Sequence, residues 1–485
     1  MLRWASVILI GLIVVVSVLE FTTDRTPLEQ LTAVVTLGGT GRTDEFAGVQ
    51  PEAVIRMGVA SWQMDEFPWE ETVRRYEHAH GGKVRVKLSI LPEGSLNSML
   101  LYWHSGYTKY DMIVAWADEE IHPFITYNWN TTDPARRSLL VNMAEHLTDQ
   151  QLQAFVPTLF VGSSMTDPQT GKTNLYELPW MGEVTAINYN KVFFKMAGVD
   201  RPPTTWEEVE EACEKLKGLQ YKDKRGTMHT VAPLAMVFAQ SGFFTQNHYI
   251  PMLAAFKKGR GVTDAQGHLD VSSPEAAEVF KTLKRWYEAG YITEKCKVQD
   301  SVEQELRVFG AAMYPHWQSR GLWAVADHGE EIIGIAPTPG VKQAGSLVCT
   351  YGCIVPKCSP VVEQAVEFAY EAFCTDTHGF QTAVANGFID PTTGKPKGGK
   401  KMPAITAMYD RKDLPAGIRD LRPGLEKGYF YPDPTNYNQC ADIVVVWFQR
   451  YLFGDKNPST GKPFTAEEAL TQAQHEIATE VYTEK

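Results

Sequence analysis

Residues 178–217 read LPWMGEVTAINYNKVFFKMAGVDRPPTTWEEVEEACEKLK, and this stretch decides the fold class of the chain. It begins with a short strand that leads into Tyr189-Asn190-Lys191 and then into a helix that ends at Gly198. A second helix begins within PPTTWEE, because Thr205 fits the N-cap and glutamates fill the first turn. A strand followed closely by helices is the local pattern of an α/β protein.

The same alternation extends outward in both directions. The segments AVIRMGVA at 53–60 and VRVKLSIL at 84–91 predict strands, and Val73 and Tyr76 lie at helical spacing between them. Together they predict a βαβ unit, to which the apolar run at 110–116 adds another strand of a parallel sheet. Helices are also expected after Ser273-Pro274 and over 360–373, and strands over 332–337 and 348–356. The fold class is therefore α/β.

Composition limits the partners of the chain. Its 485 residues suggest two or three domains, and 44% hydrophobic residues are enough for a substantial core. With 46 Lys+Arg against 58 Asp+Glu, the formal charge of -12 disfavours nucleic acid and an anionic membrane face as partners. The seven cysteines form no CxxC pair, so neither a zinc ribbon nor a thioredoxin-type site is expected. We expect no metal and no cofactor.

The N-terminus indicates export. After Arg3, residues 4–19 are uncharged and apolar, so residues 1–20 are predicted to be a signal peptide or an N-terminal membrane anchor. A lipoprotein is excluded, because the first cysteine is Cys213. Residues 21–50 are rich in Thr and Gly and predict a flexible linker. The protein is therefore expected outside the cytoplasm, with the segment either cleaved or retained.

Three similar phrases are interpreted as turns. DPQTGK at 167–172, DPTTGK at 390–395 and NPSTGK at 457–462 each place Pro and Gly where a tight turn needs them. A phosphate loop at the first is disfavoured, because Thr166 stands where GxxxxGKT requires glycine.

No catalytic signature is present. The chain has neither GxSxG nor HExxH, so we expect no enzyme, although two carboxylates of a carbohydrate-acting hydrolase would leave no such trace. Four tryptophans stand at the ends of predicted strands, where open α/β sheets bind ligands: Trp62, Trp116, Trp180 and Trp317. Because indole rings pack on the C–H faces of sugars, these positions favour a carbohydrate site.

Residues 178–217 closely resemble the signature of extracellular solute-binding proteins of family 1, the sugar-binding, maltose-binding-protein-like group. Further matching stretches lie at 269–290, 308–317, 350–373 and 453–477, so the resemblance extends from about residue 54 to the C-terminus. It implies two α/β lobes joined by hinge strands, with the ligand in a cleft between them (a type II periplasmic-binding-protein fold). It further implies delivery of the ligand to the permease of an ABC importer.

The resemblance also implies a division of the chain. We expect the first lobe to contain residues 51–182 and 306–349, and the second to contain 183–305 and 350–485. The body is longer than a typical member, with extra material around 128–138 and from 392 to about 437.

The ligand contacts implied by the resemblance fall on named positions. Glu183, six residues before Tyr189, matches a ligand-contacting acid of the family, and Trp317 matches an aromatic residue that stacks on sugar. Trp116 lies close to another such aromatic position. The remaining expected contacts are Trp62 and Gln63 after the first strand, and Tyr351 and Gly352 in a later crossing segment.

The resulting hypothesis is an exported, monomeric binding protein whose lobes close on a neutral carbohydrate. A membrane-tethered sensor or scaffold remains the alternative from a different class, followed by a carbohydrate-acting hydrolase. One local prediction concerns Cys349 and Cys353, which alternation places on the same face of one strand. Four residues of ~3.3 Å rise separate them too widely for a disulfide.

Overall fold

The structure is a computed structural model, and it describes residues 45–46, 48–92, 95–116, 121–127, 131, 137–167, 169–223, 225–239, 241–265, 267–298, 302, 304–340, 345–431 and 436–482. The apolar segment at 4–19, most of the expected linker at 21–50 and most of the extra material at 128–138 lie outside these residues. Among the described helices, none is both long and apolar enough to cross a bilayer.

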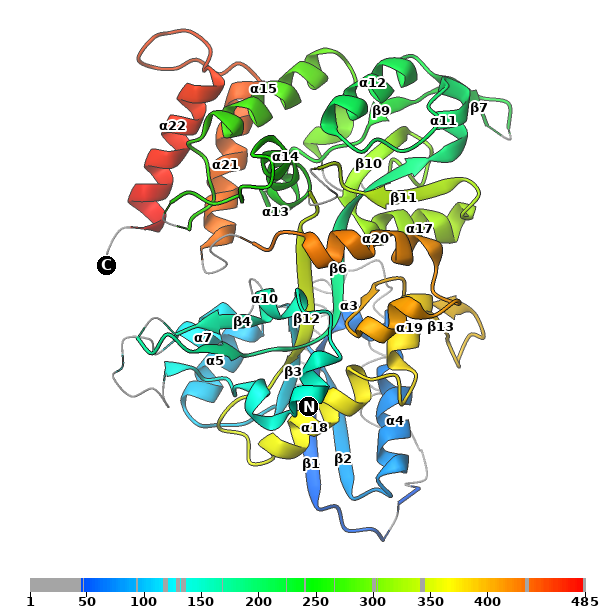
Figure 1. The fold of residues 1–485 in the computed structure, drawn as a ribbon, viewed down its shortest axis with the longest axis vertical. Helices are drawn as coiled ribbons and strands as arrows, with labels where there is room; N and C mark the ends of the chain where they lie inside the picture. The colour runs from blue at the N-terminus through cyan, green and yellow to red at the C-terminus, as the bar shows by residue number, and fades with distance from the viewer. Residues whose placement is uncertain are drawn as a thin grey trace, which may run out of the picture.

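The first lobe contains the predicted βαβ unit, in the lower half of Figure 1. Strand β1 (Ala53–Ala60) pairs in parallel with β2 (Val84–Leu91) along its whole length, and also with β3 (Met112–Trp116). Helix α4 (Trp69–Ala79) connects β1 to β2 and buries Val73 and Tyr76, as their spacing predicted. Other described helices of this lobe include α3 (Ser61–Met64), α5 (Leu96–His104), α7 (His122–Thr126), α9 (Asp149–Gln153), α10 (Leu159–Ser163), α18 (Val362–Phe373) and α19 (Phe380–Asn386).

The two lobes share one long strand. Residues 178–184 of β6 (Leu178–Asn190) pair with β12 (Val348–Ile354), which in turn pairs with β3. Residues 185–190 pair instead with β10 (Ala311–Trp317) and β11 (Ile333–Pro337) of the second lobe. All these pairings are antiparallel, so the expected parallel sheet is mixed where the chain crosses between lobes. Figure 1 shows β6 and β12 running between the lobes.

The expected lobe boundaries need correction after residue 305. Residues 311–337 belong with the second lobe, because β10 pairs in parallel with β9 (Ala232–Leu234) and β11 pairs with the second half of β6. Helices α18 and α19 belong with the first lobe, because their aromatic residues pack against α4. The Phe368 ring lies 4.8 Å from that of Tyr76, and the Phe380 ring 5.1 Å from that of Trp69. Strand pairing and ring contacts therefore divide these segments differently from the expected boundaries.

The second lobe is mainly helical around an aromatic core. Phe244 stacks on Phe448 with ring centroids 4.6 Å apart, and Phe280 lies 5.0 Å from the same ring. The principal helices are α11 (Lys191–Ala197), α12 (Trp206–Leu216), α14 (Ile250–Phe256), α15 (Pro274–Glu288), α17 (Gln318–His328), α21 (Tyr437–Leu452) and α22 (Ala466–Glu476). Thr205 caps α12 by accepting a hydrogen bond from Glu208 N, as predicted.

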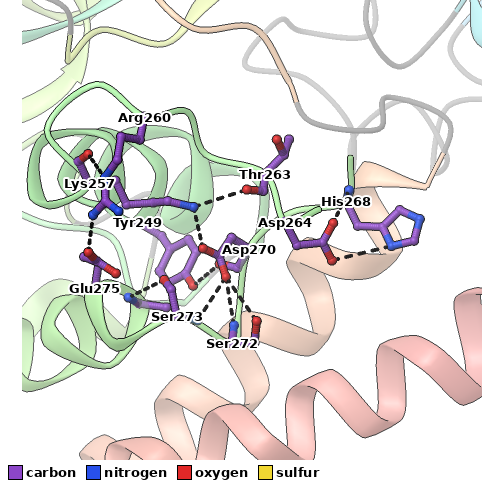
Figure 2. Close-up of polar contacts among 11 residues, drawn as sticks. Tyr249, Lys257, Arg260, Thr263, Asp264, His268, Asp270, Ser272, Ser273 and Glu275 are labelled. Carbon is purple, nitrogen blue, oxygen red and sulfur yellow. Dashed lines mark hydrogen bonds and ion pairs between the residues drawn. The ribbon is translucent and has the colours of Figure 1, made fainter. Parts of the chain in front are cut away.

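An ion pair fixes the start of α15 (Figure 2). Lys257 Nζ lies 2.6 Å from a carboxylate oxygen of Asp270, and both side chains are nearly buried. The other carboxylate oxygen accepts hydrogen bonds from the backbone N–H groups of Ser272 and Ser273 at 3.0 Å. Ser273 is the N-cap of α15, and Pro274 follows at its first position as the sequence predicted. A single carboxylate therefore joins α14, this turn and α15.

The three recurring phrases are three separate turns, as predicted. In each, the first residue accepts hydrogen bonds through its side chain from the N–H two residues later, and through its carbonyl from the N–H of the glycine. Those glycines have positive φ, which a residue with a side chain rarely adopts. The repetition therefore reflects turn chemistry.

The cysteines form no bridges. All seven lie among the described residues, and none is in a disulfide. Cys349 and Cys353 are both buried within β12, in agreement with the prediction that they lie along one strand.

Candidate functional site at the junction of the lobes

A buried ion pair lies beside the point where β6 passes from one lobe to the other. Lys401 Nζ lies 2.5 Å from Glu183 Oε1, and the two side chains are only 7% and 6% exposed. Glu183 is next to Val184, the last residue of β6 that pairs with β12. Lys401 immediately precedes β15 (Met402–Pro403), which pairs with β6 at Gly182 and Met181. The expected ligand acid is thus buried with a lysine that sequence reasoning did not single out.

Further charges surround this lysine. Burial acts to lower the pKa of Lys401, but the carboxylates of Glu183 and Glu66 more than offset this effect, so the pKa is raised above its ordinary value. The guanidinium of Arg320 is close enough to act in the opposite direction. The ammonium group therefore stays charged at neutral pH. The carboxylates of Glu183 and Glu66 are therefore matched in number by the two cationic groups of Lys401 and Arg320.

The second lobe supplies the residues at the end of β10. Trp317 is 3% exposed and pairs with Thr185, the first residue of β6 on that side. Gln318 follows at the start of α17, and its Oε1 accepts a hydrogen bond of 2.6 Å from Val184 N. His316 Nδ1 accepts one of 2.9 Å from Trp317 N, and burial holds the pKa of this histidine well below its ordinary value. His316 is therefore neutral.

Several buried polar atoms in both lobes have no hydrogen-bond partner within the described part of the chain. In the first lobe they are Gln63 Oε1, Glu66 Oε2 and Asn386 Oδ1; in the second they are His316 Nε2, Gln318 Nε2 and Ser319 Oγ. Proteins rarely leave buried polar atoms unpaired, because each such atom costs about 1–3 kcal/mol. Both lobes thus present donors and acceptors that suit a polar ligand.

Three of the expected contact residues are buried in the packing of the first lobe. Trp180 is fully buried in an aromatic cluster, with ring centroids 4.8 Å from Phe67 and 5.3 Å from Trp69. Tyr351 is buried beside it, at 6.4 Å. A Cβ on Gly352 would lie 2.4 Å from a side-chain atom of Glu177, so the glycine allows close packing. Trp180 was expected from its place at a strand end and Tyr351 and Gly352 from the resemblance, and all three lie at close-packed positions of this lobe.

Two other expected residues are described only by their backbone. Trp62 lies in α3, and Trp116 pairs with Tyr351 across β3 and β12; their side chains lie outside the described part of the structure. Gln63, on α3, is buried, and Glu66 lies in the turn that follows this helix. Of the expected residues, the structure therefore brings Glu183 and Trp317 to the junction and adds Gln63 to the residues with an unpaired polar atom.

Sequence reasoning missed Lys401, Gln318 and Glu66. Gln318 could have been noted, because it directly follows Trp317 and opens a helix. Lys401 offers no comparable signal, since it is one of four lysines in KPKGGKK and lies 218 residues from its partner. No group of three or more His, Cys, Asp or Glu residues suited to a metal ion is found among the described residues.

Comparison with known sequences agrees with the resemblance noted above. The family model described as bacterial extracellular solute-binding protein matches residues 145–372. Proteins of Brucella abortus and Brucella suis, named only as binding proteins, are 23% identical over 236 residues. That region is 49% of this chain and 50% of each relative, so the chain spans about half the length of the curated relatives it matches.

Solved structures share the fold over most of the chain. T. maritima MalE3 with maltose bound has a TM-score of 0.64 and 16% identity, covering 88% of this chain and 99% of its own. A solute-binding protein of Thermotoga lettingae with α-D-tagatose has a TM-score of 0.64 and 18% identity, covering 88% and 98%. The GacH receptor of Streptomyces glaucescens has a TM-score of 0.64 and 14% identity, covering 90% and 100%.

These neighbours have two-lobed, mixed α/β folds, and the family and its neighbours are binding proteins. Residues 145–372 thus match the model of the bacterial extracellular solute-binding family, and the described chain has the fold of the solved neighbours, in agreement with what the resemblance at residues 178–217 implied.

Proposed function

We propose that this protein is the extracytoplasmic solute-binding component of an ABC importer, and that it holds an uncharged carbohydrate between its lobes. The observation that carries the proposal is the set of buried polar atoms in both lobes that have no hydrogen-bond partner among the described residues. A polyhydroxyl ligand supplies both donors and acceptors to such a surface. Its binding to both lobes would favour the closed arrangement.

The charges at the junction support an uncharged ligand. Glu183 and Glu66 are balanced by Lys401 and Arg320, so neither a cation nor an anion gains a net Coulombic attraction there. Hydroxyl groups interact well with both signs, since they donate to carboxylates and accept from ammonium groups.

Trp317 is the proposed stacking residue. It ends β10 at the junction, where an indole face offers a large apolar surface to the C–H groups of a sugar ring. Gln63, Glu183 and Gln318 are the proposed hydrogen-bonding residues beside it.

The structural neighbours support the ligand class. The ligands of the three neighbours described above are maltose, α-D-tagatose and acarbose, and a further solute-binding protein with this fold, from Agrobacterium radiobacter, holds ribitol. These compounds are sugars, a sugar analogue and a polyol. The permease partner follows from the transporter role of such proteins. We further propose that residues 1–20 export the chain and, where uncleaved, anchor it to the membrane. No catalytic role is proposed.

Isothermal titration calorimetry with maltose, tagatose, ribitol and glucose tests the proposal. Trp317→Ala should weaken binding by more than about thirtyfold, because removing a large desolvated aromatic contact costs upward of about 2 kcal/mol. Trp206→Ala is the matched control, since this tryptophan is equally buried but lies in α12 of the second lobe. It should lower stability and leave the affinity of the folded protein intact. Unchanged affinity of folded Trp317→Ala would contradict the stacking role, and binding of none of the four compounds would contradict the proposed function.

A further inference from the structure

We propose that residues 396–401, here called the strap, are part of the ligand site and that Lys401 is a specificity-determining residue that hydrogen-bonds the ligand together with Glu183. This inference rests on the proposed function and identifies a contact outside the residues that the family resemblance implied. The strap lies within the extra material from 392 to about 437. The extra segment would therefore alter what the junction recognises.

The strap is held at both ends by strand pairing. It begins with β14 (Pro396–Lys397), which pairs with β13 (Phe388–Ile389). It ends at Lys401, directly before β15 and its pairing with β6. Lys397 Nζ donates a hydrogen bond of 2.9 Å to Oδ1 of Asp65, the residue before Glu66. These contacts connect the strap to β6 on one side and to the loop after α3 on the other.

Two glycines allow the strap to lie directly against its neighbours. Gly398 and Gly399 have φ of +60° and +76°. A Cβ on Gly398 would lie 1.8 Å from the carbonyl oxygen of Glu66, and one on Gly399 would lie 2.1 Å from Gly387 N. Only glycine fits both the conformation and the space. The position of Lys401 is therefore fixed by backbone packing rather than by its ion pair alone.

The ammonium group of Lys401 can donate more hydrogen bonds than it donates to the described residues. Among the described residues, its hydrogen-bond acceptor is Glu183, whereas an ammonium carries three protons. The unpaired Oε2 of Glu66 belongs to a carboxylate that acts electrostatically on the same lysine. A hydroxyl group placed here could accept from Lys401 and donate to a carboxylate. An amino group carrying a positive charge would instead be repelled by Lys401 and Arg320.

The inference predicts the behaviour of two lysine variants. Lys401→Met should weaken binding of whichever compound among maltose, tagatose, ribitol and glucose binds the unaltered chain, by about tenfold or more, as expected for a lost charged hydrogen bond. If glucose is that compound, the preference for glucose over glucosamine should also narrow. Lys395→Met is the matched control, because it lies in the same basic run but is exposed and outside the strap. This control variant should change neither the affinity nor the preference for glucose over glucosamine.

A pair of glycine variants tests the strap without removing a charge. Gly398→Ala must displace the strap from Glu66, whereas Gly394→Ala has a similar φ of +66° and no neighbouring atom within 4 Å. We expect affinity to fall by about tenfold in the first and to stay within about twofold of the unaltered chain in the second. The comparison of Gly398→Ala with Gly394→Ala tests the strap even if Lys401→Met does not fold.

The outcomes separate this inference from the proposed function. If the unaltered chain binds none of the four compounds, the proposed function fails. If it binds one, and folded Lys401→Met binds that compound as tightly as Lys395→Met, the inference is overturned. Equal affinities of Gly398→Ala and Gly394→Ala overturn it as well.

Discussion

Replacing Glu183 by Gln and Lys401 by Met, singly and together, would measure how strongly the junction depends on its ion pair. The two charged atoms are 2.5 Å apart, and both side chains are less than a tenth exposed. Removing one member of such a pair leaves the other charge buried, at a cost of about 3–5 kcal/mol in the free energy of unfolding.

The two single variants should differ. After Glu183→Gln, Lys401 still has the carboxylate of Glu66 nearby, so we expect a loss near the lower limit, about 3 kcal/mol. After Lys401→Met, Glu183 and Glu66 lose the cation that lies close to both, so the loss should approach about 5 kcal/mol. The double variant removes both members of the pair. It should cost about 5 kcal/mol, which corresponds to a coupling energy of about 3 kcal/mol.

Urea denaturation followed by tryptophan fluorescence gives the four free energies. The control cycle uses Lys172 and Glu145, whose atoms lie 2.8 Å apart but whose side chains are 60% exposed. Its coupling should stay below about 1 kcal/mol, because solvent screens exposed pairs. Additive losses at Glu183 and Lys401, with a coupling no larger than that of the control, would show that the two charges do not stabilise the fold as a buried pair.

The remaining predictions concern the second lobe and the cysteines. Burial acts to raise the pKa of Asp270, but hydrogen bonds from Lys257 and from the backbone lower it below its ordinary value. Asp270→Asn should therefore cost about 3 kcal/mol at pH 7, and the difference from the unaltered chain should shrink as the pH falls through the folded-state pKa. Denaturation at pH 7 and pH 3 checks this, with the more exposed Asp264→Asn as control; a constant difference would contradict it. Burial raises the pKa of the Cys353 and Cys374 thiols well above the ordinary value, so iodoacetamide at pH 8 should modify them only after unfolding. Rapid labelling of these two cysteines in the native protein, detected by mass spectrometry, would show that they are accessible.

Local sequence rules were sufficient to predict several strands, helix starts and turns of this protein. The spans of β1 and β2 and the caps at Thr205 and Ser273 depend on side-chain periodicity and on hydrogen bonds between residues a few positions apart. The turn at Asp167 is equally local, and its two recurrences form in the same way. These interactions are complete within one segment, so a single sequence is enough to predict them.

The family resemblance, carried by residues 178–217 and 308–317, extended the prediction to the two-lobed fold and to Glu183 and Trp317 at the crossing. The structure divides the later segments between the lobes differently from the expected boundaries. That division depends on pairings such as β10 with β9, and on the packing of α18 against α4. Such contacts join residues far apart in the chain, and their apolar patterns are alike on both sides of the junction.

The tertiary structure separates two of the strand-end tryptophans. Trp180 and Trp317 occupy equivalent places in the sequence pattern, yet Trp180 packs within the aromatic cluster of the first lobe and Trp317 lies where β6 changes lobes. The partner of Glu183 likewise comes from 218 residues away, on a strap positioned by two glycines and a neighbouring loop. Local sequence determines which elements form, whereas the charges and ring faces that meet at the junction are set by how distant segments pack.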